Sequence, residues 1–175
     1  MTSIRGGEVV KNNRVFSVYS PVILLAFLLL FILCSKEAGA DKQDSAFGEK
    51  IAGTYLLTEA DEGGSRIVTI TADAGWFGIH SFQFDNKFSN QQGVWENTGK
   101  RKITVRTLDF ISLKDGVGSA LFNFTVEFDN AYQQVSGEPS GKLFPPGVDP
   151  LDPVAVPIKT FSNTFKGKRL IITEY

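Results

Sequence analysis

The residues of this chain that could do chemistry are few, and the most versatile of them is His80, the only histidine. A general acid–base role would require His80 to face a cavity beside a carboxylate, which Asp109 or Glu127 could supply. The alternative is a histidine that is hydrogen-bonded at the lining of the fold and takes no part in a reaction. The sequence alone identifies no catalytic residue. If the protein is an enzyme, the candidates are His80, Tyr55 and Asp109.

Patterns that would define a metal site or a nucleophile are missing from the sequence. One histidine cannot form a histidine cluster, so aspartate or glutamate would have to complete any site that included it. Asp149 and Asp152 are expected on a loop, but their spacing does not match a calcium-binding EF-hand. A serine triad would need His80 as its base, and no Gly-x-Ser-x-Gly motif accompanies it. We therefore expect no metal and no cofactor.

The charges are nearly balanced, with 18 basic and 19 acidic residues. The main basic cluster, Lys100-Arg101-Lys102, follows a turn signal and is expected to be the solvated end of a hairpin. Proteins that bind nucleic acid or an anionic membrane through a folded surface usually carry a larger basic patch. We therefore expect no nucleic-acid partner, and membrane contact only through the N-terminal segment.

The first forty residues have the three parts of a secretory signal. Basic residues precede the uncharged run Val22–Cys34, and the small residues Ala38-Gly39-Ala40 follow it. The run is shorter than the roughly 20 residues that a membrane-spanning helix needs. We therefore expect residues 1–40 to be a signal peptide and the protein to be secreted or periplasmic.

Two alternatives remain open for this segment. Residues 15–20 are also uncharged, so residues 15–34 could be retained as a membrane anchor. Cys34 could be a lipid attachment site, although lipoprotein signals have a small residue before the cysteine and Leu33 is large. The simpler interpretation is that Cys34 is a mildly apolar member of the hydrophobic run.

The rest of the chain has the pattern of an antiparallel β-fold, with short β-branched and aromatic runs between turn signals. Residues 41–50 are polar and expected as a linker, and residues 51–175 form one domain. The stretch 143–157 contains five of the seven prolines, so we expect a long loop there. No helix is expected beyond a short turn near residues 155–161. The predicted strands are residues 51–58, 66–71, 76–84, 93–97, 102–113, 119–129, 131–138 and 166–174.

Eight strands in meander order predict an all-β domain, either a single antiparallel up-and-down barrel or a flattened sandwich. We favour the barrel because closure removes both edges of the sheet. Alternation places Phe122 and Phe124 on one face of their strand, and Trp76, His80 and Phe82 on one face of theirs. An interior rich in rings suits a barrel that encloses a ligand and also one that is filled by its own side chains.

Three short motifs resemble those of a known group of proteins. They are Gly53-Thr54-Tyr55, Gly93-Val94-Trp95-Glu96-Asn97-Thr98-Gly99, and Val135-Ser136-Gly137 with a later Asp149-Pro150. Over residues 51–152 the chain resembles the small secreted lipocalin-like (calycin-type) barrel proteins of bacteria, which open with a Gly-Thr-Trp-like strand. This chain has Tyr55 in place of that tryptophan. The resemblance implies a lipocalin-like barrel that binds a small hydrophobic molecule.

Related small barrels include cyclases of the allene oxide cyclase and spirotetronate cyclase kinds, but their catalytic residues have no match here. Three functions thus remain open: a binding barrel, a cyclase or isomerase acting on a flexible apolar substrate, and a structural or interaction module with a filled core. A cavity of roughly several hundred Å³ would favour the first two. The residues expected to bind the ligand are Tyr55, Trp76, His80, Phe82, Trp95, Phe122 and Phe124.

Overall fold

The computed structural model describes residues 45–61 and 64–172. The predicted signal peptide or anchor and Cys34 lie outside the described residues, so both remain predictions. Within the two described ranges, no helix is long and apolar enough to cross a membrane.

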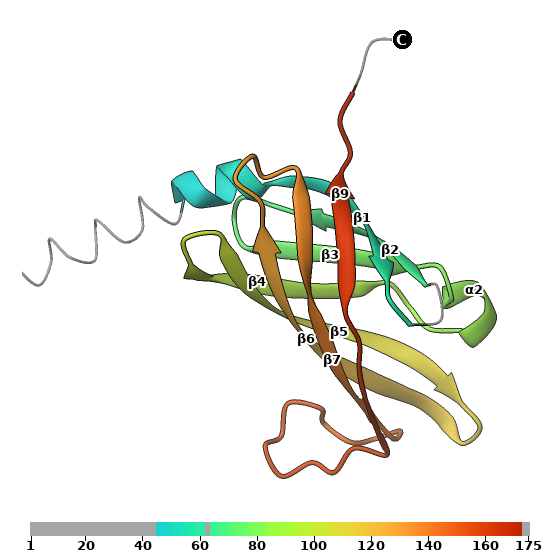
Figure 1. The fold of residues 1–175 in the computed structure, drawn as a ribbon. Coiled ribbons are helices and arrows are strands. Elements are labelled where there is room, and N and C mark those ends of the chain that lie inside the picture. Colours follow the sequence, from blue (N-terminus) through green and yellow to red (C-terminus); the bar gives the residue numbers. More distant parts are fainter. Residues whose placement is uncertain (1–44, 62–63, 173–175) are drawn as a thin grey trace, which may run out of the picture. The chain divides into compact units, whose positions relative to one another are not determined.

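The described residues contain nine strands in one antiparallel sheet that closes on itself (Figure 1). Each strand from β1 to β7 pairs with the next one along the chain. β9 pairs with both β7 and β1 and so joins the two ends of the sheet. The predicted all-β, up-and-down barrel is therefore confirmed. The elements are β1 (Gly53–Glu59), β2 (Ser65–Ile70), β3 (Gly75–His80), α2 (Gln83–Asn86), β4 (Gln91–Gly99), β5 (Lys102–Leu113), β6 (Gly116–Phe128), β7 (Gln134–Phe144), β8 (Lys159–Ser162) and β9 (Phe165–Arg169).

The strands β8 and β9 pair with β7 as if they were a single strand. Gly137 pairs with Phe165 and Ser140 pairs with Ser162, so the register continues unbroken across the two intervening residues. β9 has β1 as its second neighbour, whereas β8 has no second neighbour among the described strands. If β8 and β9 are counted as one strand, the barrel has eight strands. Its sheet is closed by hydrogen bonds where β9 pairs with β1, and it has an unpaired edge at β8.

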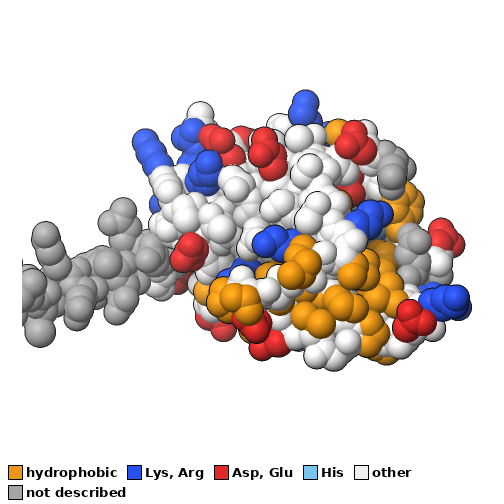
Figure 2. Space-filling model, turned by 90° about the horizontal axis from the view of Figure 1, so that it is seen from below, with side chains coloured by type: hydrophobic (Ala, Val, Ile, Leu, Met, Phe, Trp, Pro, Cys, Tyr) orange, Lys and Arg blue, Asp and Glu red, His pale blue; other side chains and the backbone are white. Residues whose placement is uncertain are grey.

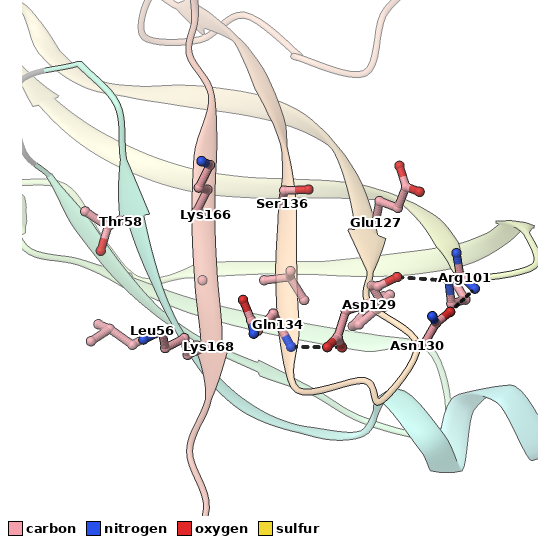
Figure 3. Close-up of a pocket in the computed structure, with 13 residues that line it drawn as sticks. Leu56, Thr58, Arg101, Glu127, Asp129, Asn130, Gln134, Ser136, Lys166 and Lys168 are labelled. Atoms are coloured by element: carbon pink, nitrogen blue, oxygen red, sulfur yellow. Dashed lines mark hydrogen bonds between the residues drawn. The ribbon is translucent and has the colours of Figure 1, made fainter.

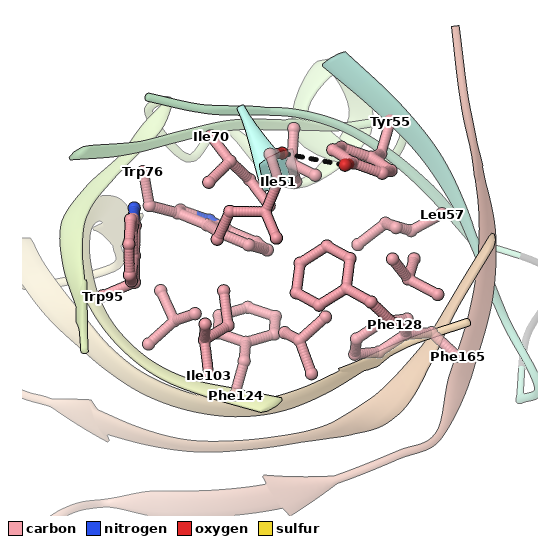
Figure 4. Close-up of a cluster of buried hydrophobic side chains, with 14 of the residues drawn as sticks. Ile51, Tyr55, Leu57, Ile70, Trp76, Trp95, Ile103, Phe124, Phe128 and Phe165 are labelled. Carbon is pink, nitrogen blue, oxygen red and sulfur yellow. Dashed lines mark hydrogen bonds between the residues drawn. The ribbon is translucent and has the colours of Figure 1, made fainter. Parts of the chain in front are cut away.

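The closed part of the barrel is filled with apolar side chains (Figure 4). Alternation directs them inward as predicted, since Phe122, Phe124 and Phe128 on β6 are all buried. Tyr55 and Phe128 meet edge to face with ring centroids 6.0 Å apart, which adds to the free energy gained by burial. Other members of this cluster are Ile51, Leu57, Ile70, Trp76, Trp95, Ile103 and Phe165.

The polar linker predicted ahead of the first strand is instead helical over residues 45–51. Phe47 and Ile51 lie four residues apart, hence on one side of the helix, and both are buried. Phe47 packs edge-on against Trp95 and Phe128, with ring centroids 6.2 and 6.4 Å away. The helix therefore covers one end of the barrel interior. Its apolar pair is too short a pattern to have stood out among polar neighbours.

The strand that was predicted to end at Glu138 continues through Pro139 to Phe144. Pro139 lies opposite Asn163, at the break between β8 and β9, and its carbonyl accepts a hydrogen bond from the Asn163 N–H at 3.1 Å. Proline has no N–H to return, so the ladder loses one hydrogen bond at this point. β8 itself forms where only a turn was expected, and β3 ends at His80 instead of continuing to residue 84.

Candidate functional site

The open end of the barrel contains the cavity that best fits a functional site. Its volume is about 590 Å³, and Phe161 and Ser162 of the half-paired strand β8 form one side of it. The polar side chains that line the cavity include Glu59 of β1, Arg66 of β2, His80 of β3 and Asp109 of β5. Its apolar lining consists of Phe82, Phe88, Ile111, Ala120, Phe122, Pro139, Leu143 and Phe161.

A larger hollow, of about 830 Å³, lies on the outer wall across β1, β9, β7 and β6 (Figure 3). Most of its side chains are exposed, and several of its polar groups bond to one another. Arg101 donates to Asn130, and the backbone N–H of Gln134 donates to Asp129 at 3.1 Å. Polar groups on a mostly exposed surface, whose hydrogen bonds are made to their neighbours, are ordinary barrel surface, so the cavity at the open end is the better candidate.

Five polar side chains form a layer across the barrel beneath the cavity, which we call the polar floor: Glu59, Arg66, His80, Gln91 and Asp109. They come one each from β1 to β5. Arg66 pairs with His80, and the β4–β5 register brings Gln91 opposite Asp109. Alternation places each of them on the same face as the apolar core residues of its own strand. The polar floor is thus the next layer above the filled core.

Arg66 is the centre of this layer. Its Nε donates to Glu59 Oε1 at 2.5 Å, and its Nη1 donates to Gln91 Oε1 at 2.7 Å. The guanidinium carbon lies 5.3 and 5.5 Å from the ring centres of Phe122 and Phe124. A buried charge is stable only where it is paired and hydrogen-bonded, and Arg66 meets both conditions.

The hydrogen bonds of His80 determine which of its nitrogens carries the proton. Its Nδ1 accepts from the backbone N–H of Phe82 at 3.0 Å, so the proton lies on Nε2. Nε2 then points to Glu59 Oε2, 3.4 Å away. Burial alone would raise the pKa of Glu59, but the His80 hydrogen bond and the Arg66 charge bring it down to about 2. Glu59 is therefore a permanent anion that neutralises Arg66.

The pKa of Asp109 is shifted in the opposite direction from that of Glu59. Burial raises its pKa to about 7, against the opposing effects of the Gln91 amide and the Arg66 charge. Gln91 Nε2 nevertheless makes no hydrogen bond of good geometry to any described group, so the amide assists Asp109 only loosely. A buried carboxyl that changes charge near neutrality beside a cavity is the kind of group that binding and catalytic sites contain.

The structure places the residues predicted to bind a ligand at two different levels. His80, Phe82 and Phe122 line the cavity, and the ring of Phe124 lies under Arg66. The remaining three, Tyr55, Trp76 and Trp95, belong to the packed core below the polar floor. Figure 4 shows all three among the buried apolar side chains. A direct role of these three in ligand binding stays a prediction.

Of the candidates for acid–base chemistry, His80 and Asp109 are both part of the polar floor. Tyr55 is remote from it, and its hydroxyl donates to the carbonyl of Ile51 at 2.8 Å. Glu127 is exposed on the outer face of β6 and does not accompany His80. Among the residues that the structure describes, no group of three or more histidines, cysteines or acids is arranged to hold a metal ion.

Sequence reasoning missed three members of the polar floor, Glu59, Arg66 and Gln91. Alternation along the strands gives a signal for two of them. Arg66 is on the same face of its strand as Val68 and Ile70, and Glu59 is on the same face as Leu57. A charged residue on an otherwise inward face indicates either the end of a strand or a paired buried charge. Only the register between strands distinguishes these two cases.

The β7–β8 connection joins two strands that line the cavity, and it carries exposed apolar side chains. The Ile158 N–H donates to the Leu143 carbonyl at 2.8 Å, which ties the end of this loop to the cavity wall. Figure 2 views the molecule from the side where this loop lies and shows hydrophobic side chains gathered on part of that face. The exposed apolar residues of the loop are Leu151, Val154, Val156 and Ile158.

The fold and the site together define a class: a small eight-stranded up-and-down barrel, filled at one end and open over a polar floor at the other. No protein-family model matches the chain, and no curated protein matches it either. The function must therefore be argued from the geometry of the cavity.

Proposed function

We propose that the barrel binds a small, largely apolar molecule with one polar end, in the cavity over the polar floor. The observation that carries this proposal is the cavity itself, whose volume of about 590 Å³ falls within the range of small-molecule sites, about 300–1,000 Å³. Such sites have mostly apolar walls and a few converging polar groups that orient the ligand. The rings of Phe82, Phe88 and Phe161 supply the walls, and the polar floor supplies the orientation.

The alternative of a purely structural barrel fits this arrangement less well. A barrel filled for stability would continue its apolar core to the end of the strands, as it does around Phe47 and Phe128. At the open end it instead buries Arg66 and Asp109, and buried charges of this kind rarely add to stability. Their presence under a cavity supports a site that recognises something.

The test uses the fluorescent probe N-phenylnaphthylamine, which is apolar and uncharged, titrated into the full chain. We expect saturable binding that Phe161→Ala weakens about tenfold, which corresponds to about 1.4 kcal/mol of lost contact. Phe161 is suited to this test because it is only half buried, and its ring centre lies 5.0 Å from that of Phe122 in the cavity wall. Phe77→Ala is the matched control, since Phe77 faces outward from β3. Equal effects of the two changes, or no saturable binding, would refute the proposal.

A second function, isomerisation or cyclisation of a flexible apolar substrate, is favoured by the position of Asp109. A carboxyl whose pKa is about 7 can take and return a proton near neutral pH. The test is deuterium uptake from heavy water next to the carbonyl of methyl octyl ketone in the presence of the full chain. Uptake that Asp109→Asn abolishes, while the ketone still binds, would establish the enzyme. Binding without uptake would leave the protein a binder.

We propose in addition that the protein is exported, on the strength of the signal pattern in residues 1–40. N-terminal sequencing of the protein isolated from its own host tests this. A chain that starts near Asp41 in the secreted or periplasmic fraction is expected. A chain that keeps residues 15–34 and sediments with membranes would establish the anchor instead.

A further inference from the structure

The edge of Arg66 that faces the cavity has a hydrogen-bond donor to spare. A guanidinium has five N–H groups on three nitrogens. Glu59 and Gln91 engage Nε and Nη1, and Nη2 has no hydrogen-bond partner among the described residues. Nη2 is not fully buried, because it lacks a partner and yet is not among the buried unpaired atoms. Arg66 lines the cavity. This nitrogen can therefore bond to a group that enters the cavity, and it can only donate.

Asp109 lines the same cavity from β5, and the Arg66 charge acts on it. As a neutral acid it can donate a hydrogen bond, and as a carboxylate it can only accept. An apolar molecule that covers the polar floor excludes water and deepens the burial of this carboxyl. Burial favours the neutral form of an acid, so the occupied cavity favours Asp109 as a donor.

The other charged and titratable groups around Asp109 do not change this balance. Glu59 neutralises Arg66, and His80 is turned toward Glu59, with Nδ1 accepting from the Phe82 N–H and Nε2 3.4 Å from Glu59 Oε2. Two further charged groups, Asp61 and Lys159, line the cavity from exposed positions and are opposite in sign. The protonation of Asp109 therefore changes the charge of the floor by one unit.

We propose that the polar end of the ligand is a carbonyl or carboxylic oxygen, held between Nη2 of Arg66 and the protonated carboxyl of Asp109. This inference rests on the proposed function and specifies the class of molecule that the cavity takes. A carbonyl oxygen has two lone pairs and can accept from both groups at once. The N–H groups of a ligand amine would face the N–H groups of Arg66, so that donors would meet donors. An alkane would leave both Arg66 and Asp109 without a hydrogen-bond partner.

The experiment compares four probes of similar length: methyl octyl ketone, decanol, decylamine and decane. Each is titrated calorimetrically into the full chain at about pH 6 and about pH 8, on either side of the pKa of Asp109. We expect the ketone to bind and to lose about tenfold in affinity at the higher pH, as the protonated fraction of Asp109 falls about tenfold. Asp109→Asn, whose amide is a donor at both pH values, should reduce the pH effect to less than about twofold. Asp115→Asn, at the exposed β5–β6 turn outside the cavity lining, is the control and should behave as the parent.

Two kinds of result overturn the inference while the binding function survives. One is decanol or decylamine binding more tightly at the higher pH, since both would use Asp109 as an acceptor. The other is decane binding as well as the ketone, because the polar floor would then contribute nothing. Absence of binding by all four probes would overturn the proposed function itself. The isosteric Asp109→Asn change avoids the loss of folding that Arg66→Ala could cause by leaving Glu59 buried without its partner.

Discussion

The interior of the barrel is filled differently at its two ends. At the closed end, the helix over residues 45–51 covers a core of rings such as Phe128, and the Tyr55 hydroxyl is bonded to a backbone carbonyl. At the open end, charged groups are buried under empty space. The contrast indicates that stability comes mainly from one end and recognition from the other.

The largest expected effect belongs to the closed end. Phe128→Ala removes a ring that packs against Phe47, Tyr55 and Tyr132, and it should cost about 3–5 kcal/mol of unfolding free energy. Urea denaturation measures the loss. Phe77→Ala, on the outer wall, is the matched control and should cost about 1 kcal/mol or less. Similar losses for the two variants would remove the closed end as the main source of stability.

At the open end, Asp109→Asn should abolish a pH dependence of stability. Burial raises the pKa of Asp109 from 3.8 to about 7, so the folded protein keeps a proton that the unfolded chain has lost. Stability should therefore decrease as pH rises from about 4 to about 7, by up to about 4 kcal/mol. Urea titrations across this range measure the decrease. The variant should be the more stable protein above pH 7, and a parent-like pH curve would contradict the assignment.

Glu59 should give the reverse dependence at acid pH. Its pKa is lowered from 4.5 to about 2, so it stabilises the fold above about pH 4.5 and loses this contribution as pH falls toward 2. The contribution is about 3 kcal/mol. Glu59→Gln should cost about that amount at neutral pH and flatten the acid limb of the stability curve, whereas Glu127→Gln on the outer face should do neither. Equal acid sensitivity of the two variants would show that Glu59 is not a paired anion.

The smallest expected effect is the sharpest test of the comparison. The double change Glu59→Leu with Arg66→Met gives the open end the chemistry of the closed end, because it replaces the buried pair by apolar groups. Such replacements are often neutral, so we expect stability within about 1 kcal/mol of the parent. The ketone probe should bind at least about tenfold more weakly. A large loss of stability would mean that the polar floor is structural, which calorimetric unfolding would show.

The sequence predicts the parts of the fold that repeat a regular pattern. The strand at residues 102–113 was predicted with its true boundaries, because Ile103 and Val105 alternate with polar residues without interruption. The long loop before β8 was predictable from its prolines. β8 was not, since its four residues carry no pattern of their own and depend on pairing with β7.

The candidate site was predictable only in part. His80 and Asp109 stood out as titratable residues on strands, and Phe82 and Phe122 as rings on an inward face. The sequence does not indicate how far along the barrel axis each residue lies. Trp76 shares a face with His80, yet it lies in the packed core, because it is four residues before His80 on β3.

The unbroken register of β8 and β9 has a consequence for how the opening could be changed. β1 ends at Glu59, and its pairing with the returning chain ends where the Ala60 N–H meets the Thr164 carbonyl. The pairing of β1 with the returning chain thus stops short of β8. Extending the β1–β2 hairpin by one pair of residues on each arm would supply β8 with a neighbour. The entrance would narrow while Arg66 and Asp109 stayed as they are.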